Sequence, residues 1–284
     1  MTTASLPTPL VSPEQLSAAI AAGAAPLIID CSFDLADPDA GERAFAQGHL
    51  PGAIHAHLDR DLAGAKTGRN GRHPLPTRAD WATTLARLGV TPARAVVVYD
   101  AQGGMYAARA WWMLRWVGHG AVSVLDGGLG AWTAAGGTLE TGGVAPIAAT
   151  APYPGGASLV ATVDGDALLK SLGRVTLLDA RAGERYRGEV EPLDARAGHI
   201  PGARSRFFKD NLDAQGRFRP ATELRAAFTA FGAVPAQMVH QCGSGVTACH
   251  NLLAMEVAGL PGSALYPGSW SEWSSDPTRP VAVG

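Results

Sequence analysis

The sequence predicts an α/β fold of two tandem domains, each with a mainly parallel central sheet flanked by helices on both faces. Three observations support this prediction: short apolar runs alternate with helical stretches, four segments recur in the same order, and 284 residues suffice for two ordinary domains. Apolar runs such as 27–29 (Leu-Ile-Ile) and 95–98 (Ala-Val-Val-Val) are typical of strands that are buried on both faces. Strands of this kind that alternate with helices favour a parallel sheet.

The internal repeat is the strongest argument for two copies of one domain. The four matched pairs of segments are 27–30 with 176–179, 49–53 with 199–203, 96–100 with 238–242, and 126–132 with 267–273. Each second segment follows its first by roughly 140 to 150 residues, and so regular an offset indicates a duplicated unit. We therefore predict a first domain over 1–141, a linker over 142–158 and a second domain over 159–284.

Helices are expected between the predicted strands. Ser12 before Pro13 has the pattern of an N-cap followed by proline in the first turn of a helix. The other predicted helices run over about 79–88, 105–116, 222–231 and 247–257.

Charge and composition exclude several classes of function. A formal net charge of -2 offers no basic surface for nucleic acid or for an anionic membrane. No apolar run approaches the roughly 20 residues that a membrane-spanning helix needs, and the first residues lack the pattern of a signal peptide. Three cysteines in a chain of this length predict free thiols rather than a disulfide framework. We expect a cytoplasmic protein that binds neither nucleic acid nor membrane.

Cys242 carries the strongest chemical signal in the sequence. It lies between a predicted strand and a predicted helix, where Gly243 and Gly245 let the backbone curl around one point. Backbone N–H groups and the positive end of the following helix stabilise a thiolate in such a loop, and the thiolate is the nucleophilic form of cysteine. A lone cysteine is more often a packed apolar side chain, and we assign that role to Cys31 and Cys249.

Residues 242–248, Cys-Gly-Ser-Gly-Val-Thr-Ala, resemble the active-site loop of the 3-mercaptopyruvate sulfurtransferase family, within the rhodanese superfamily. The flanking matches are 179–181 (Asp-Ala-Arg), the two His-Leu/Ile-Pro-Gly-Ala segments and 268–273, so that the resemblance covers about 11–273. It implies two tandem rhodanese-like domains. The first is expected to be inactive, because Asp100 stands where the second has Cys242.

The resemblance implies sulfur transfer in two stages. Cys242 takes sulfur from 3-mercaptopyruvate, pyruvate is released, and the persulfide passes its outer sulfur to a thiol, thioredoxin or cyanide. No metal or organic cofactor is implied, and the cysteine and histidine spacing fits no usual zinc site. Two alternatives remain open: thiosulfate:cyanide sulfurtransferase activity, and a persulfide carrier without turnover. A cysteine-dependent phosphatase is disfavoured, because Ala248 and Cys249 stand where an arginine has to close the loop.

The loop after Cys242 is neutral, whereas relatives that use the dianion thiosulfate carry basic residues in the corresponding loop. The resemblance therefore favours 3-mercaptopyruvate as the sulfur donor. The predicted binding residues in the loop are Gly243, Gly245, Val246 and Thr247. The charge that binds the substrate must therefore come from outside the loop. Arg181 is the first candidate for a bidentate grip on a carboxylate, with Arg185 sharing the site and Arg187 as a third possibility.

Ser244 is expected to help protonate the leaving enolate through a proton relay. By resemblance, a histidine and an aspartate from the first copy orient this serine, and His49 matches the histidine position. Asp39 is the preferred aspartate and Asp37 the alternative. His199, the repeat counterpart of His49, is expected to have a structural role.

Overall fold

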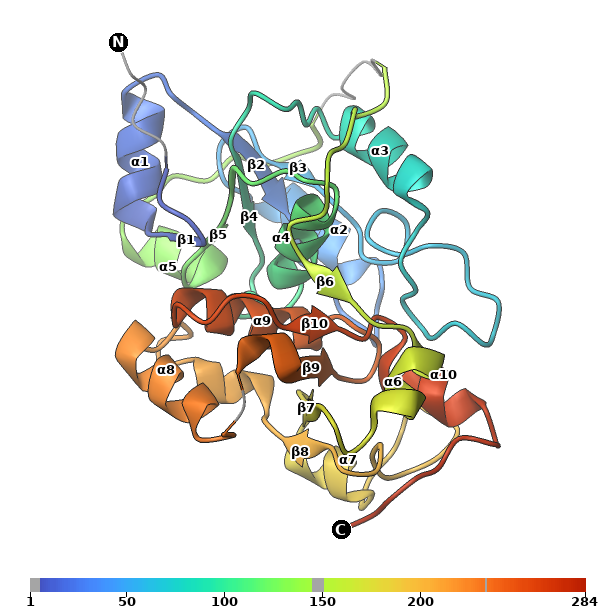
Figure 1. Ribbon diagram of the computed structural model, residues 1–284. Helices are drawn as coiled ribbons and strands as arrows, with labels where there is room; N and C mark the ends of the chain where they lie inside the picture. The colour runs from blue at the N-terminus through green and yellow to red at the C-terminus, as the bar shows by residue number, and fades with distance from the viewer. Residues whose placement is uncertain (1–5, 145–150, 233) are drawn as a thin grey trace. The chain divides into compact units, whose positions relative to one another are not determined.

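The computed structural model describes residues 6–144, 151–232 and 234–284, and the chain folds into two units (Figure 1). The first unit comprises Met1–Ala63, Pro76–Leu159 and Ala214–Arg217, and the second comprises Gly64–Leu75, Val160–Asp213 and Phe218–Gly284. In each unit five strands form one sheet, and every pair of neighbouring strands is parallel. The predicted α/β fold class is confirmed.

The units differ from the predicted domains at two segments: Ala214–Arg217 belongs to the first unit, and Gly64–Leu75 belongs to the second. Gly64–Leu75 lies within the first sequence copy but packs with the second unit. Two contacts show how it is held there: the N–H of Arg72 donates to Oγ of Ser271 at 3.0 Å, and a Cβ on Gly71 would lie 2.8 Å from the carbonyl oxygen of Gly268. The predicted linker, 142–158, lies partly outside the described residues, and its described part belongs to the first unit.

The sheet of the first unit has the order β1-β5-β4-β2-β3. Its central strands β2 and β4 pair in register from Leu27 opposite Val96 to Asp30 opposite Tyr99, and both are buried along their whole length. The elements are β1 (Leu10–Val11), α1 (Pro13–Ala21), β2 (Leu27–Asp30), α2 (Ala40–Gln47), β3 (Ile54–His55), α3 (Arg78–Arg87), β4 (Val96–Tyr99), α4 (Ala107–Trp116), β5 (Val122–Leu125) and α5 (Gly128–Ala134).

The second unit repeats this topology with the order β6-β10-β9-β7-β8. Its central strands β7 and β9 pair from Thr176 opposite Met238 to Asp179 opposite Gln241. The elements are β6 (Ala161–Thr162), α6 (Gly165–Ser171), β7 (Thr176–Asp179), α7 (Gly183–Arg187), β8 (Arg204–Ser205), η1 (Phe208–Asn211), α8 (Ala221–Thr229), η2 (Pro235–Gln237), β9 (Met238–Gln241), α9 (Thr247–Val257), β10 (Ala264–Leu265) and α10 (Ser269–Ser275).

Local sequence signals account for where several helices begin. Ser12 caps α1: its side chain accepts the N–H of Gln15, and the Gln15 side chain accepts the N–H of Ser12. The helix predicted over 247–257 is α9 with the same bounds. The helix predicted over 105–116 begins two residues later, at Ala107, because the carboxylate of Asp100 holds the turn before it.

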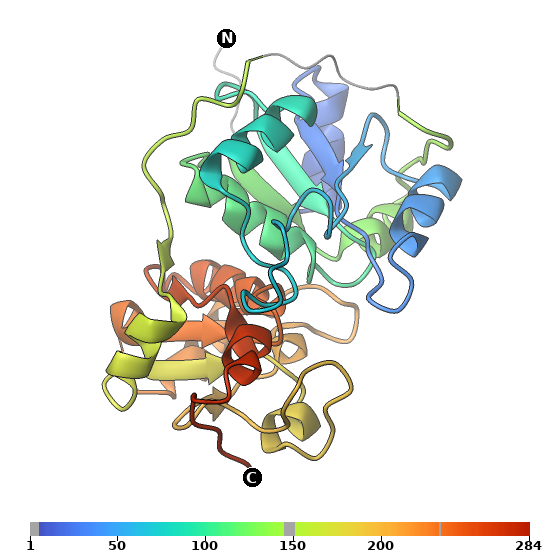
Figure 2. The same ribbon diagram turned by 90° about the vertical axis from the view of Figure 1, so that its right-hand side faces the viewer.

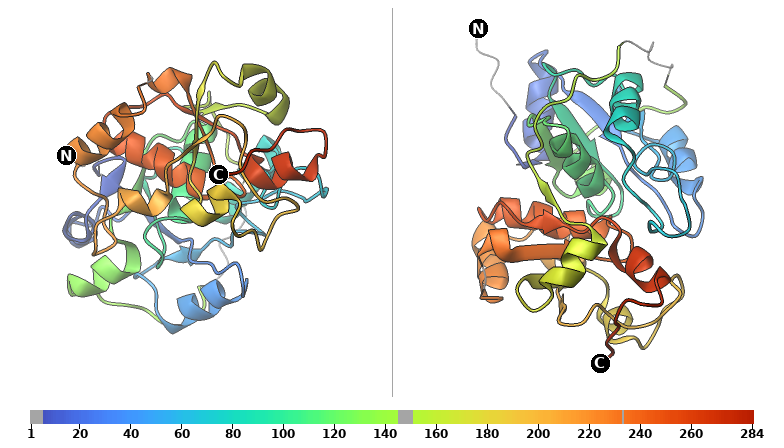
Figure 3. Two further views of the ribbon diagram at one scale, coloured as in Figure 1. Left: turned by 90° about the horizontal axis from the view of Figure 1, so that it is seen from below. Right: turned by 45° about the vertical axis from the view of Figure 1, so that its right-hand side comes forward.

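Helices cover both faces of each sheet, as Figures 2 and 3 show. The two cores place a tryptophan equivalently: the indole N–H of Trp132 donates to the carbonyl of Thr138 at 2.9 Å, and that of Trp273 to Pro280 at 2.8 Å. None of the helices in the described residues combines the length and hydropathy needed to span a bilayer. Because all strands of a sheet are parallel, the loops after β7 and β9 lie at one edge, and this edge carries the candidate site.

Candidate active site

Cys242 lies in the loop that joins β9 to α9. Only 2% of the residue is exposed, and the N–H of Gly245 donates to its sulfur at 3.2 Å. Gly245 has a φ of +75°, and a Cβ there would collide with the carbonyl oxygen of Pro267. Val246 and Thr247 lead directly into α9, whose first turn adds its positive end to the loop. The loop therefore places a backbone N–H and the beginning of a helix next to the sulfur, an arrangement that suits anion binding.

The loop is braced by the beginning of α10. Cys242 donates its N–H to Oγ of Ser269 at 3.1 Å, and its carbonyl accepts the N–H of Trp270 at 3.0 Å. The carbonyl of Gly243 accepts the N–H of Ser271 at 2.8 Å. Ser269 has a φ of +54° and is the only non-glycine residue with a positive φ in the described part of the chain. A strained residue that holds the backbone of the Cys242 loop is the kind of feature that clusters at functional sites.

Ser244 has a histidine partner, but it is not the predicted one. Its Oγ lies 2.7 Å from Nδ1 of His73, which belongs to Gly64–Leu75, and both residues are buried. His49 is engaged elsewhere: its Nδ1 lies 2.7 Å from the carbonyl oxygen of Phe45, and its ring stacks on Phe45 with centroids 3.8 Å apart. The prediction that pairs Ser244 with His49 is therefore corrected to His73.

His49 and His199 have the same environment in the two copies. The ring of His199 stacks on Tyr186 at 4.0 Å, and its Nδ1 lies 2.9 Å from the Tyr186 carbonyl oxygen. Each histidine also forms an isolated antiparallel bridge, His49 with Glu140 and His199 with Ala282. Because the copy with Asp100 and the copy with Cys242 place this histidine in the same environment, we assign the position to the fold.

The predicted aspartates do not orient His49. Asp39 is exposed and directly precedes α2, while Asp37 forms an ion pair with Arg43. Neither forms a hydrogen bond with His49 in the described part of the chain. The partner that sequence reasoning missed, His73, lies in a loop without periodicity, where an adjacent arginine and histidine were the sole signal.

The Arg181 side chain is buried and hydrogen-bonded within the second unit. Its guanidinium donates to both carboxylate oxygens of Asp179 and to the carbonyl of Gly198, the shortest contact to each being 2.7 Å. Nη1 lies 3.3 Å from Glu191, and the guanidinium lies 4.7 Å from the centroid of the Trp270 ring. With its donors engaged and its side chain buried, Arg181 is not available to a substrate. The predicted grip by Arg181 is therefore corrected to a structural role.

Arg185 does lie beside the loop, together with Arg72, which sequence reasoning missed. A Cβ placed on Gly243 would lie 2.9 Å from Nη2 of Arg72 and 3.4 Å from Nη1 of Arg185. Among the described residues, Nε of each arginine is buried without a hydrogen-bond partner. Arg187 instead pairs with Glu189 at the surface. Two guanidinium groups next to the residue that follows Cys242 make a site suited to an anion.

In the first unit, the loop between β4 and α4 corresponds to the Cys242 loop, and the side chain of Asp100 fills it. Asp100 is fully buried and its carboxylate accepts four backbone N–H groups at 2.8 to 2.9 Å. The donors belong to Gln102, Gly104, Tyr106 and Ala107. Burial raises the pKa of Asp100, and the four hydrogen bonds act in the opposite direction. This loop is an anion cradle whose anion is part of the chain, and it holds no nucleophilic sulfur.

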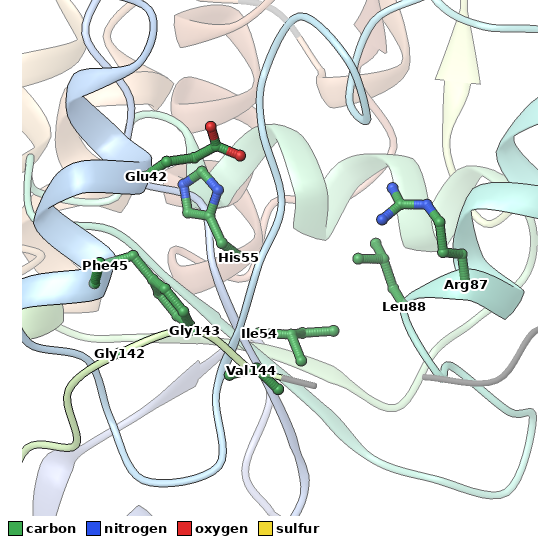
Figure 4. A pocket seen from close by; sticks show the side chains of 10 residues that line it. Glu42, Phe45, Ile54, His55, Arg87, Leu88, Gly142, Gly143 and Val144 are labelled. Carbon is green, nitrogen blue, oxygen red and sulfur yellow. The ribbon is translucent and has the colours of Figure 1, made fainter. Parts of the chain in front are cut away.

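A pocket of about 410 Å³ lies elsewhere in the first unit. Figure 4 shows Glu42 and Phe45 on one side of it and Arg87 with Leu88 on the other. Its charged side chains already have partners, since Glu42 pairs with Arg60 and Arg87 with Asp61. The pocket contains none of the predicted site residues.

The other two cysteines, Cys31 and Cys249, are buried thiols outside any disulfide in the described part of the chain. Burial, with Asp30 nearby, raises the pKa of the Cys31 thiol well above its usual value, so the thiol stays protonated. Cys249 donates its S–H to the carbonyl of Gly245 at 3.4 Å. Across 6–144, 151–232 and 234–284, no group of three His, Cys, Asp or Glu residues is placed to hold a metal ion.

Two stretches of the chain, 12–135 and 164–276, match the family model of the rhodanese-like domain. A protein of Pseudomonas aeruginosa named "Probable 3-mercaptopyruvate sulfurtransferase" is 48% identical over 264 residues, which cover 91% of this chain and 92% of that protein. The thiosulfate sulfurtransferase of Gallus gallus is 33% identical over 280 residues, which cover 93% of this chain and 92% of that protein.

A solved structure is similar over the same extent. The 3-mercaptopyruvate sulfurtransferase from Leishmania major superposes with a TM-score of 0.82 at 30% identity, covering 93% of this chain and 74% of that chain. Both the sequence matches and the structural match extend over the two units, so the duplicated architecture as a whole is shared with these proteins.

Proposed function

Because the chain belongs to the rhodanese family, we propose that it is a sulfurtransferase that carries sulfur on Cys242, taken from 3-mercaptopyruvate. The observation that carries the proposal is the loop in which the N–H of Gly245 donates to the sulfur of Cys242. A thiolate held by backbone dipoles is a nucleophile, and the same dipoles stabilise the persulfide that follows.

The first stage forms one S–S bond and breaks one C–S bond. The Cys242 thiolate attacks the sulfur of 3-mercaptopyruvate, and the bonding pair of the C–S bond leaves with the carbon as pyruvate enolate. A proton on that carbon completes pyruvate, and the sulfur stays on Cys242 as a persulfide. In the second stage a thiol, reduced thioredoxin or cyanide takes the outer sulfur and the Cys242 thiolate is restored.

Ser244 and His73 are the proposed proton donors to the enolate. Their contact of 2.7 Å lets the imidazole hold the serine hydroxyl in place and resupply its proton. Both side chains are buried, which keeps the proton transfer away from bulk water.

Arg185 and Arg72 are the proposed carboxylate binders. They lie against Gly243, next to the nucleophile, and their Nε atoms have no partner among the described residues. We assign Gly243, Gly245, Val246 and Thr247 to the loop that surrounds the transferred sulfur. The free state of all three cysteines supports a reducing compartment, and we keep the cytoplasm as the proposed location.

Thiosulfate as the donor is the second candidate function. The thiosulfate sulfurtransferase of Gallus gallus supports it, since its similarity covers nearly the whole chain. The neutral loop and the carboxylates around the arginines favour 3-mercaptopyruvate instead. A carrier without turnover is the third possibility.

One assay tests the proposal. Steady-state release of pyruvate from 3-mercaptopyruvate, with cyanide or a thiol as acceptor, is expected to exceed many equivalents of enzyme and to show ping-pong kinetics. Cys242→Ser is expected to abolish it, because a hydroxyl cannot carry a persulfide, while Cys249→Ser retains it. Release that stops at one equivalent would identify a carrier. A higher kcat/KM for thiosulfate would contradict the proposed donor.

A further inference from the structure

The two arginines beside the loop share a buried carboxylate. Asp194 pairs with Nη1 of Arg72 through one oxygen, and its other oxygen lies 3.1 Å from Nη2 of Arg185. The Asp194 side chain is 3% exposed, whereas those of Arg72 and Arg185 are 25% and 18% exposed. The carboxylate is therefore more buried than the two guanidinium groups that it joins.

Asp194 belongs to a chain of alternating charges that begins at Arg72 and ends at Asp179. Arg185 also donates to Glu191 at 2.6 Å, and Glu191 lies 3.3 Å from Arg181. Arg181 in turn pairs with Asp179 at 2.7 Å. The network thus contains three arginines and three carboxylates and has no formal surplus of positive charge.

Asp194 weakens the attraction of the two arginines for an anionic substrate, and it weakens it more for a dianion than for a monoanion. When a substrate carboxylate meets Arg72 and Arg185, the negative charge of Asp194, which pairs with both, offsets part of their attraction. The offset grows with each charge the substrate carries, because it is a Coulomb repulsion in a partly buried place. 3-Mercaptopyruvate is a monoanion at neutral pH, and thiosulfate is a dianion.

We propose that Asp194 is a specificity-determining residue that biases the site toward singly charged sulfur donors and against thiosulfate. This inference rests on the proposed function, since it concerns the donor that reacts with Cys242. Asp194 acts through Arg72 and Arg185 and needs no contact with the reacting atoms.

The test compares Asp194→Asn with the unchanged protein. The ratio of kcat/KM for thiosulfate to kcat/KM for 3-mercaptopyruvate is expected to rise about tenfold, the size of effect that removing one nearby charge has on one extra substrate charge. Glu189→Gln is the matched control, since Glu189 is exposed and pairs with Arg187 away from this network, and it should leave the ratio unchanged.

The thermal unfolding of each variant is measured as well, because the loss of the Asp194 carboxylate removes an ion-pair partner from both Arg72 and Arg185 and can destabilise the fold. Asp194→Ser supplies a second neutral variant, and the change in ratio is measured on whichever neutral variant melts cooperatively. Asp194→Glu keeps the charge and should keep the original ratio.

The outcomes separate this inference from the proposed function. If the unchanged protein does not turn over 3-mercaptopyruvate, the proposed function fails, and the effect of Asp194 is measured on thiosulfate kcat/KM alone. If a folded neutral variant has the original ratio, the inference about Asp194 is wrong while the proposed function stands. A changed ratio in Asp194→Glu would also overturn it, since that variant keeps the negative charge.

Discussion

Single residues of one chemical type take different roles here because their immediate partners differ. His49 and His73 are both buried histidines, but His49 stacks on Phe45 and His73 contacts the hydroxyl of Ser244. Arg181 and Arg185 are four residues apart and both pair with carboxylates, yet Arg181 is buried against Asp179 and Gly198, whereas Arg185 lies beside Gly243 of the loop. The residue type alone did not distinguish these roles.

The role of His73 can be tested at this scale. His73→Ala is expected to lower kcat with 3-mercaptopyruvate about a hundredfold, since a positioned acid contributes at least that much to proton transfer. The kcat with thiosulfate should fall less in His73→Ala, because the leaving group sulfite needs no proton on a carbon atom. Both values come from steady-state kinetics with cyanide as acceptor.

His49→Asn serves as the comparison for His73→Ala. Its main expected effect is a lower melting temperature, because the stacking on Phe45 and the contact with its carbonyl are lost. If His49→Asn lost kcat as His73→Ala is expected to, the original assignment of His49 to the relay would stand.

At the scale of elements, α5 of the first copy and α10 of the second begin with different residues in the same left-handed conformation. The first copy has Gly128 at this position, with a φ of +57°, and the N–H of Leu129 donates to the Asp100 carbonyl. The second has Ser269 with a φ of +54°, where Oγ accepts the N–H of Cys242. The second copy thus keeps the same backbone path with a serine, next to the loop that holds Cys242, and the hydrogen bond offsets the strain.

Substitutions at Ser269 separate strain from the hydrogen bond. Ser269→Ala keeps the strain and leaves the buried N–H of Cys242 unpaired, so it should lower the free energy of unfolding by about 1–3 kcal/mol. Ser269→Gly relieves roughly 1–2 kcal/mol of left-handed strain and should be less destabilising. Urea unfolding gives both values.

Alkylation of Cys242 by iodoacetamide reports on the loop itself in these variants. Both are expected to alter the alkylation rate at pH 7, because the N–H of Cys242 is no longer held by Oγ of Ser269. Unchanged alkylation in both would mean that Ser269 does not position the loop.

At the scale of the whole molecule, the buried His240 makes the stability of the fold depend on pH. His240 lies in β9, fully buried, with Nε2 3.0 Å from the sulfur of Met255, and burial lowers its pKa to about 3. The first copy has Val98 in the corresponding strand position. The histidine is therefore neutral in the fold but gains a proton near pH 6.5 when the chain unfolds.

This difference predicts the direction of the pH dependence. Below pH 6.5 the unfolded chain binds a proton that the fold does not, so stability falls as the pH drops from about 6.5 toward 3. Between pH 7 and pH 5 the unchanged protein should lose about 2 kcal/mol more than His240→Val. The measurement is urea unfolding at several pH values, and parallel curves for the two proteins would contradict the burial of a neutral histidine.

The sequence by itself determined the duplicated α/β architecture, the strands and helices, and the loop that presents Cys242. These features follow from patterns local in the chain: apolar runs, a capping box at Ser12 and glycines around one cysteine. The tertiary structure alone decided which side chains meet that cysteine. Arg72 and His73 come from a loop without periodicity that packs on the second unit, and Arg181 is used by partners that no local pattern predicts. Roles set by contacts between distant segments depend on the folded chain, because only folding brings the partners within hydrogen-bonding distance.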